Sequence, residues 1–188
     1  MPLRNTFIIT LAFIMSAIVM MTGAALSSNG TYAIPAISAQ QDGDPIPAHA
    51  ISYYSLTKHE RKQIDCLTEN IYREAAYEPR IGWVAVAFVT MNRLYSGNYA
   101  DSVCGVIYQP NQFSWVGMRN LPKINSDVYD QIRRVATAVY LDYDRNRDVT
   151  GGATYYHADY VSPGWSNLHK TKKIGTHIFY KSNKDIIS

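Results

Sequence analysis

The segment from Gly82 to Met91 is apolar on nearly every side of a helix, and it constrains the fold more than any other part of the chain. The apolar run continues to Leu94, which is long for a strand, and the small residues Ala85 and Ala87 suit close helix packing. A helix that is apolar all round is buried on all sides. The sequence therefore favours a central buried helix here over the alternative, a buried strand.

A second helix is predicted to begin at Thr57 and to carry a carboxylate on its apolar side. Thr57 and Glu60 have the spacing of a capping box, in which two side chains and two backbone N–H groups satisfy one another. At about 100° per residue, Glu74 lies about 20° from Leu67 on the arc that also carries Ile64, Ile71 and Ala75. A carboxylate on an apolar face must be paired, protonated or functional, because desolvation disfavours its charged form.

Two interpretations of Glu74 follow from this position. A carboxyl with a raised pKa meets the requirement for a general acid, as in glycosidase chemistry. The alternative is a residue at the edge of the buried stripe, paired with Arg80 or Arg93. Glu78 is predicted to follow the end of the helix, because Pro79 disfavours helical geometry before it. There Glu78 would lie at the mouth of a cleft or cap the next helix.

The N-terminus is typical of an exported protein. Arg4 precedes an uncharged, mostly apolar run from Phe7 to Leu26, which predicts a signal peptide or an uncleaved membrane anchor over residues 1–26. Residues 27–55 are small, polar and proline-containing, and are interpreted as a flexible linker before a domain over 56–183. We expect a location in the periplasm or cell envelope, with membrane contact only through residues 7–26 if they are not cleaved.

The only two cysteines, Cys66 and Cys104, predict a disulfide in an exported chain, and two buried free thiols are the alternative. The net charge is +3, with no long basic run, which argues against a nucleic-acid binder. Outside the membrane, a modest positive charge favours anionic envelope polymers as partners. Further along the chain, residues 126–143 predict a packing helix, and residues 153–158 and 176–181 predict short strands of a small sheet.

Several blocks of sequence, in order, resemble the SleB-type cell wall hydrolases, which include the spore cortex-lytic enzymes. The blocks are residues 71–79, 82–87, 92–93, 103–109, 112–115, 151–158, 163–165 and 174–180. Ordered agreement across about residues 56 to 181 is far more specific than any single block. One departure is Ala76-Tyr77-Glu78, where the family commonly has Arg-Gly-Glu, so that a bulky side chain replaces a glycine beside Glu78.

The resemblance implies an α+β, mainly helical, lysozyme-like and lytic transglycosylase-like domain with a small antiparallel sheet. It implies that the chain is an enzyme that cleaves peptidoglycan glycan strands between N-acetylmuramic acid and N-acetylglucosamine, with Glu74 as the catalytic residue. As a lytic transglycosylase it would leave 1,6-anhydro-muramic ends and need only one carboxylate. A muramidase-type hydrolase would need a second carboxylate, for which Glu78 and Asp101 are the nearby candidates. The two cysteines also look like those of family members from Gram-negative bacteria, which supports the periplasm.

Substrate contacts are predicted from two regions besides Glu78. A loop after Pro110 and Asn111 presents Gln112, Phe113, Ser114 and Trp115, which we assign to the cleft wall; Phe113 is equally suited to anchoring the loop in the core. The predicted strand and the 163–165 block supply the other contacts, namely Thr154, Tyr156, His157 and Trp165.

Two other classes of protein compete with this interpretation. A zinc amidase or peptidase would draw its ligands from scattered residues, which are His157, Asp159, His169 and His177. They include no tight helical histidine pair, so we predict neither a metal nor another cofactor. A non-catalytic wall-binding module is the second alternative. The sequence fits a bacterium that remodels its own wall and a phage endolysin equally well.

Overall fold

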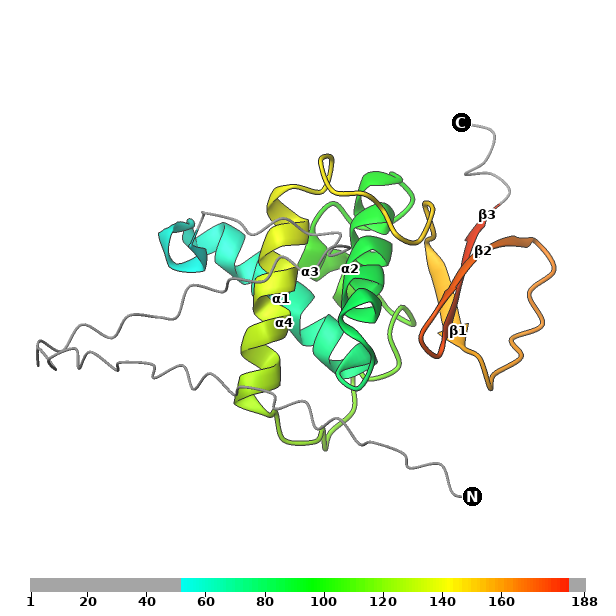
Figure 1. The fold of residues 1–188 in the computed structure, drawn as a ribbon, viewed down its shortest axis with the longest axis horizontal. Coiled ribbons are helices and arrows are strands. Elements are labelled where there is room, and N and C mark those ends of the chain that lie inside the picture. Colours follow the sequence, from blue (N-terminus) through cyan, green and yellow to red (C-terminus); the bar gives the residue numbers. More distant parts are fainter. Residues whose placement is uncertain (1–51, 183–188) are drawn as a thin grey trace, which may run out of the picture. The chain divides into compact units, whose positions relative to one another are not determined.

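A computed structural model describes residues 52–182, which form helices followed by a three-stranded sheet (Figure 1). The predicted segment 1–26 and residues 27–51 of the predicted linker lie outside the described residues. Within 52–182, no helix combines the length and apolar character needed to cross a membrane. The elements are η1 (Tyr53–Ser55), α1 (Lys58–Ala75), α2 (Arg80–Tyr95), α3 (Val103–Tyr108), α4 (Ser126–Leu141), β1 (Tyr155–Ala158), β2 (Leu168–Ile174) and β3 (His177–Ser182).

The first helix begins as its capping box predicts. The backbone N–H of Glu60 donates to Thr57 Oγ1 at 3.2 Å, and the N–H of Thr57 donates to Glu60 Oε2 at 2.8 Å. These bonds satisfy N–H groups that a helix N-terminus otherwise leaves unpaired. Helix α1 ends at Ala75, and α2 begins only five residues later, after Pro79. Glu74 therefore lies in the last turn of α1, close to a sharp change of chain direction.

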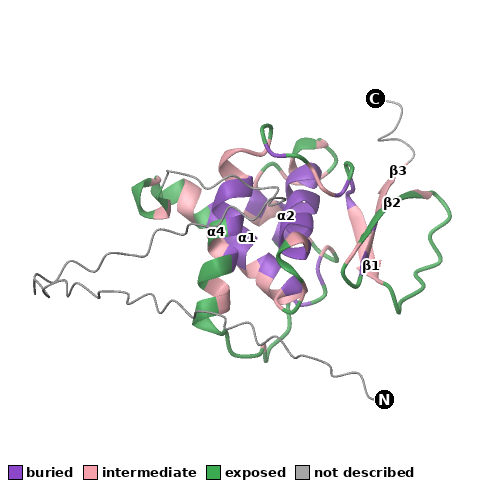
Figure 2. Cartoon of the chain, viewed as in Figure 1, coloured by how far each residue is buried: buried purple, intermediate pink, exposed green. Residues whose placement is uncertain are grey.

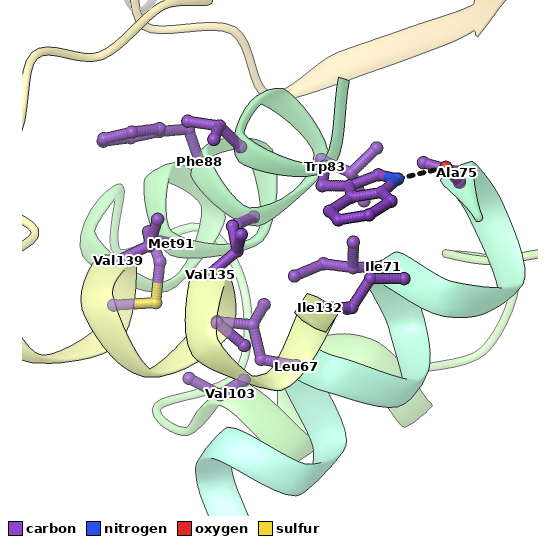
Figure 3. Close-up of a cluster of buried hydrophobic side chains, with 14 of the residues drawn as sticks. Leu67, Ile71, Ala75, Trp83, Phe88, Met91, Val103, Ile132, Val135 and Val139 are labelled. Atoms are coloured by element: carbon purple, nitrogen blue, oxygen red, sulfur yellow. Dashed lines mark hydrogen bonds between the residues drawn. The ribbon is translucent and has the colours of Figure 1, made fainter. Parts of the chain in front are cut away.

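Helix α2 is the predicted central helix. Every residue from 82 to 93 is buried, so the prediction of a buried helix is confirmed and the strand alternative is wrong. Figure 2 shows this buried stretch in purple, beside the buried stripes of α1 and α4. The side chains of four helices meet in one cluster (Figure 3), which includes Leu67, Ile71, Trp83, Phe88, Met91, Val103, Ile132, Val135 and Val139.

Trp83 joins the core to the end of α1. Its indole Nε1–H donates to the backbone carbonyl of Ala75 at 2.8 Å (Figure 3). This carbonyl is among the last of α1, which lack partners within the helix. The bond therefore holds the turn of α1 that carries Glu74 against the start of α2.

The sheet has the strand order β1-β3-β2, and both strand pairs are antiparallel. Strands β1 and β3 occupy the two segments for which the sequence predicts strands, whereas β2 was missed because its lysines and exposed residues give no regular alternation. Phe179 of β3 is fully buried and packs with Ala85 and Val89 of α2. One face of the sheet is therefore turned toward the central helix.

The predicted disulfide joins Cys66 of α1 to Cys104 of α3, with 5.3 Å between their Cα atoms. It is confirmed, and the free-thiol alternative is wrong. Helix α3 itself was not predicted. The bond fixes the loop after α2 against the helix that carries Glu74.

Candidate active site

Glu74 and Tyr156 form the centre of the candidate site. The phenol hydroxyl of Tyr156, on β1, donates to Glu74 Oε2 at 2.9 Å, although 82 residues separate the two in sequence. Glu74 is half-buried at the end of α1. The bond therefore joins the helical part of the domain to the sheet at the one carboxylate that the helix pattern had singled out.

The environment of Glu74 raises the pKa of its carboxyl above the ordinary value. Burial is the largest cause, because it penalises the charged form. The hydrogen bond from Tyr156 and the positive charge of Arg93 act in the opposite direction and lower the pKa in part. The carboxyl of Glu74 therefore keeps its proton to a higher pH than an exposed glutamate does. Once the proton is lost, the hydroxyl of Tyr156 is already in position to donate a hydrogen bond to the carboxylate.

Tyr156 is suited to serve as a permanent hydrogen-bond donor. Burial and the neighbouring carboxylate hold the pKa of its hydroxyl well above the ordinary value, so it stays protonated. Its ring is held by His177 and Phe179 of β3, with centroids at 5.1 and 5.6 Å. The prediction of Tyr156 as a substrate contact missed this role, because no local pattern indicates that β1 lies beside the end of α1.

Arg93 places a buried positive charge near this pair. The side chain is only 6% exposed, and its Nε–H donates to the backbone carbonyl of Thr154 at 2.7 Å. Its guanidinium lies over the rings of Phe113 and Tyr99, at 5.0 and 5.4 Å from their centroids. Among residues 52–182, its buried Nη1 has no hydrogen-bond partner. The sequence signal for a special role of Arg93 was its positive charge near the end of a mostly apolar helix.

Glu78 is bound to the turn between β2 and β3. Its carboxylate accepts a hydrogen bond from the backbone N–H of Thr176 at 3.1 Å and a shorter one from the Thr176 hydroxyl. Gly175 makes this approach feasible, because a β-carbon there would lie 1.7 Å from Glu78 Oε2. The carboxylate thus ties the junction between α1 and α2 to the sheet, which gives it a structural role that the sequence did not predict.

The predicted cleft loop divides into buried and accessible side chains. Phe113 and Trp115 are only 6% and 7% exposed, and Trp115 Nε1–H donates to Asn70 Oδ1 at 3.1 Å. They hold the loop in the core, as the alternative for Phe113 anticipated. Gln112 is half-buried and Ser114 is exposed, and both stay predicted substrate contacts.

The predicted contacts on the sheet fall on different sides of it. Successive strand residues point to opposite faces, so Tyr156 faces the helices and His157 faces away from them. Trp165 contacts the ring of His157 at 5.4 Å and so belongs to that far face. Thr154 is buried, and its carbonyl accepts from Arg93. Of the predicted set, the structure brings Glu74 and Tyr156 together and separates His157 and Trp165 from them.

The residues considered for zinc do not form a ligand set. Across the described part of the chain, no three His, Cys, Asp or Glu side chains gather in a group that could hold a metal ion. His157 instead contacts the hydroxyl of Tyr180 through Nε2 at 3.0 Å, and Asp159 pairs with Lys173 at 2.9 Å.

The fold, mainly helical with a small antiparallel sheet, resembles that of a solved protein domain. The structure is similar to the crystal structure of the catalytic domain of the Bacillus cereus SleB protein, with a TM-score of 0.50 and 29% sequence identity. The match covers 71% of this chain and 100% of that domain. The predicted fold class is thereby confirmed. Together with a match to a family model, it defines the chain as a cell wall hydrolase enzyme domain.

The sequence comparison identifies the family. A family model described as Cell Wall Hydrolase matches residues 77–180, more than half of the chain, and the chain belongs to the cell wall hydrolase family. The matched region includes Arg93, Tyr156 and the contact between Glu78 and Thr176. It begins three residues after Glu74, so Glu74 itself lies just outside the matched region.

Two curated relatives agree with this assignment. The spore cortex-lytic enzyme of Halalkalibacterium halodurans is 37% identical over 118 residues, which are 62% of this chain and 34% of the relative. The spore cortex-lytic enzyme of Bacillus cereus is 33% identical over 125 residues, which are 65% of this chain and 46% of the relative. The match thus spans a third to a half of the length of these relatives.

Proposed function

We propose that this domain cleaves the glycosidic bond between N-acetylmuramic acid and N-acetylglucosamine in peptidoglycan, with Glu74 as its general acid. The observation that carries the proposal is the half-buried Glu74 carboxyl, whose pKa is raised by burial and whose Oε2 accepts a hydrogen bond from Tyr156 at 2.9 Å. The relatives named as spore cortex-lytic enzymes support peptidoglycan as the substrate.

The first step uses the proton of Glu74. The carboxyl transfers it to the glycosidic oxygen, the bond between that oxygen and C1 of the muramic acid breaks, and the N-acetylglucosamine leaves as an alcohol. Positive charge then develops on C1 and the ring oxygen of the muramic residue. The Glu74 carboxylate formed at that moment is stabilised by the hydroxyl of Tyr156 and by the positive charge of Arg93.

The second step restores Glu74. The carboxylate removes the proton from the C6 hydroxyl of the same muramic residue, and the C6 oxygen forms a bond to C1. The product carries a 1,6-anhydro ring, and Glu74 is again protonated. No water and no second carboxylate take part, so this lytic transglycosylase route is the proposal.

The hydrolytic alternative requires a second carboxylate to activate water or to attack C1. Glu78 accepts two hydrogen bonds from Thr176, which favours a structural role over a catalytic one. Asp101 is exposed and precedes Ser102, the residue that caps α3. Neither position resembles the desolvated setting of Glu74, and this difference supports the route with one carboxylate.

We also propose that the domain works outside the cytoplasm and follows an N-terminal signal or anchor segment and a linker. The disulfide between Cys66 and Cys104 supports an oxidising compartment, because such bonds are rare in cytosolic proteins. The apolar run from Phe7 to Leu26 supports export.

The test is mass spectrometry of the fragments that the full chain releases from purified peptidoglycan. We expect 1,6-anhydro-muramic ends from the wild-type protein. Glu74→Gln, which keeps the shape but cannot give up a proton, should lower the rate at least about a hundredfold. Tyr156→Phe should lower it by a smaller factor, because it removes only the donor to the carboxylate.

Tyr54→Phe is the matched control, since Tyr54 is 80% exposed in η1, and its rate should be unchanged. Reducing muramic ends would show that the enzyme is a hydrolase and not a transglycosylase. Cut peptides with intact glycan strands would overturn the proposal altogether, and so would a Glu74→Gln variant that keeps half of the wild-type rate.

A further inference from the structure

The sheet carries a cluster of aromatic rings on the face opposite Tyr156. Tyr155 and His157 of β1 alternate with Tyr156, and Tyr155 is paired with Tyr180 of β3 in the sheet register. Trp165, in the segment between β1 and β2, packs onto Tyr155, His157 and Tyr180. We call Tyr155, His157, Trp165 and Tyr180 the outer aromatic cluster. In Figure 1 the segment between β1 and β2, drawn in orange, lies on the side of the sheet away from α2.

Trp165 is held in place yet remains open to solvent. Its ring centroid lies 5.4 Å from His157, 5.7 Å from Tyr180 and 5.9 Å from Tyr155, each time in an edge-on arrangement. It is nevertheless 42% exposed. A large apolar ring that is fixed by its neighbours and not covered loses little entropy when a ligand stacks on it.

His157 supports this cluster and is not its reactive group. Its ring stacks on Tyr180 with centroids 5.3 Å apart, and its Nε2 lies 3.0 Å from the Tyr180 hydroxyl. Its Nδ1 lies 2.8 Å from the carbonyl of Ala158. Both ring nitrogens are therefore occupied, and the imidazole is held in place within the cluster.

Positive charge adjoins the cluster. Lys170 of β2 is paired with Tyr180 in the register and is exposed on the same face. Lys172 is paired with Phe179 in the register and so belongs to the other face, and the charge of Lys173 is paired with Asp159 at 2.9 Å. The ligand that fits has flat, weakly polar faces to stack on an aromatic ring and carries negative charge nearby.

We propose that the outer aromatic cluster is a second binding surface for peptidoglycan, at which a sugar ring stacks on Trp165 and Lys170 faces a carboxylate of a peptide stem. This inference rests on the proposed substrate of the Glu74 site but concerns a different face of the sheet. Polymeric peptidoglycan offers sugar rings and acidic stems in regular repeats, so one strand can be bound here while another segment of the wall is cut. The surface therefore raises affinity for the polymer without taking part in bond cleavage.

The test measures binding of the full chain to purified sacculi by sedimentation, in the Glu74→Gln background so that the polymer stays intact. Adding Trp165→Ala should weaken binding about tenfold, as loss of an aromatic anchor does. Lys170→Gln should weaken it less and should reduce its dependence on salt. Tyr160→Ala is the matched control, because Tyr160 belongs to the same segment, is 85% exposed and lies outside the cluster.

A second measurement separates binding from chemistry. With Glu74 intact, Trp165→Ala should keep the wild-type kcat and KM on short soluble glycan fragments and lose activity only on sacculi. An equal loss on both substrates would mean that Trp165 merely supports the fold and would overturn the proposal. Lys170→Glu, at an exposed position, repeats the binding test without disturbing the cluster.

Other outcomes also decide the proposal. Sacculus binding that is unchanged in both Trp165→Ala and Lys170→Glu would overturn it. If Trp165→Ala and Lys170→Glu abolished binding to vesicles of anionic lipid but left sacculus binding unchanged, the surface would be assigned to a membrane instead. A wild-type protein, with Glu74 intact, that binds sacculi through Trp165 but releases no glycan fragments would overturn the proposed function and leave this surface supported.

Discussion

The contact between Glu78 and Thr176 gives a sharp prediction about which carboxylates take part in chemistry. Glu78 lies four residues after Glu74, and its carboxylate accepts two hydrogen bonds from the turn between β2 and β3. The same sheet positions Tyr156, whose hydroxyl donates a hydrogen bond to Glu74. We expect Glu78 to act by holding the sheet in place, so that Glu78→Gln and Thr176→Val have similar and modest effects on activity.

The size of the effect follows from the two bonds. A hydrogen bond to a charged group contributes about 1.5–3 kcal/mol to stability, and exposure of Thr176 reduces this to about 1 kcal/mol for each bond. Glu78→Gln removes the charge and should lower the free energy of unfolding by about 1–2 kcal/mol. Thr176→Val removes only the hydroxyl bond and should cost about 1 kcal/mol.

Urea unfolding of the two single variants and the double variant measures the coupling, which should be about 1 kcal/mol. Cleavage of soluble glycan fragments should fall less than about tenfold in each single variant, because Glu74 and Tyr156 remain. If Glu78 were the second catalytic carboxylate, Glu78→Gln would lose about a hundredfold or more while Thr176→Val stayed near the wild-type rate. That divergence between the two variants would refute the structural role.

Two further predictions concern the disulfide and the ionisation of Glu74. The double variant Cys66→Ala/Cys104→Ala should unfold with a free energy lower by about 4 kcal/mol, the loop-closure value for the separation of 38 residues; a loss under about 1 kcal/mol in urea unfolding would contradict this. Burial raises the pKa of Glu74 in the folded state, so the protonated carboxyl contributes to the free energy of unfolding. This contribution is complete below the ordinary pKa of about 4.3 and is lost as the pH rises through the higher folded-state pKa. Glu74→Gln should therefore be more stable than the wild-type protein at pH 7–8 but not near pH 3–4, and equal melting-temperature differences at both pH values would show that Glu74 carries no raised pKa.

Local pattern predicted α1, α2 and α4, but not the short helix α3. Thr57 and Glu60 mark the start of α1 with a capping box, and the absence of any polar face marks α2 as buried, because both signals depend only on residues within a few turns. The same reasoning pointed to Glu74. It missed β2, since a strand exposed on an outer edge and rich in lysine has neither the alternation nor the residue types that indicate a strand.

Long-range contacts account for what the sequence did not predict at the site. The donor to Glu74 lies 82 residues away, and the partner of Glu78 lies 98 residues away. Helical periodicity places a carboxylate on a face but carries no information about which strand will pack against that face. The predicted contacts Tyr156 and His157 are neighbours in one strand, and strand alternation sends them to opposite sides of the sheet. Which of the two sides faces Glu74 depends on how the sheet packs against the helices.

The sequence by itself determined that this chain has a buried central helix, a preceding helix with a carboxylate on its apolar side, and one pair of cysteines that can form a disulfide. These are properties of residue type and local spacing. Only the tertiary structure decided that Tyr156 meets Glu74, that Glu78 holds the turn at Thr176, and that Trp165 belongs to another face. Those contacts arise when the sheet packs against α2, and the free energy of that packing depends on the whole core rather than on any segment alone.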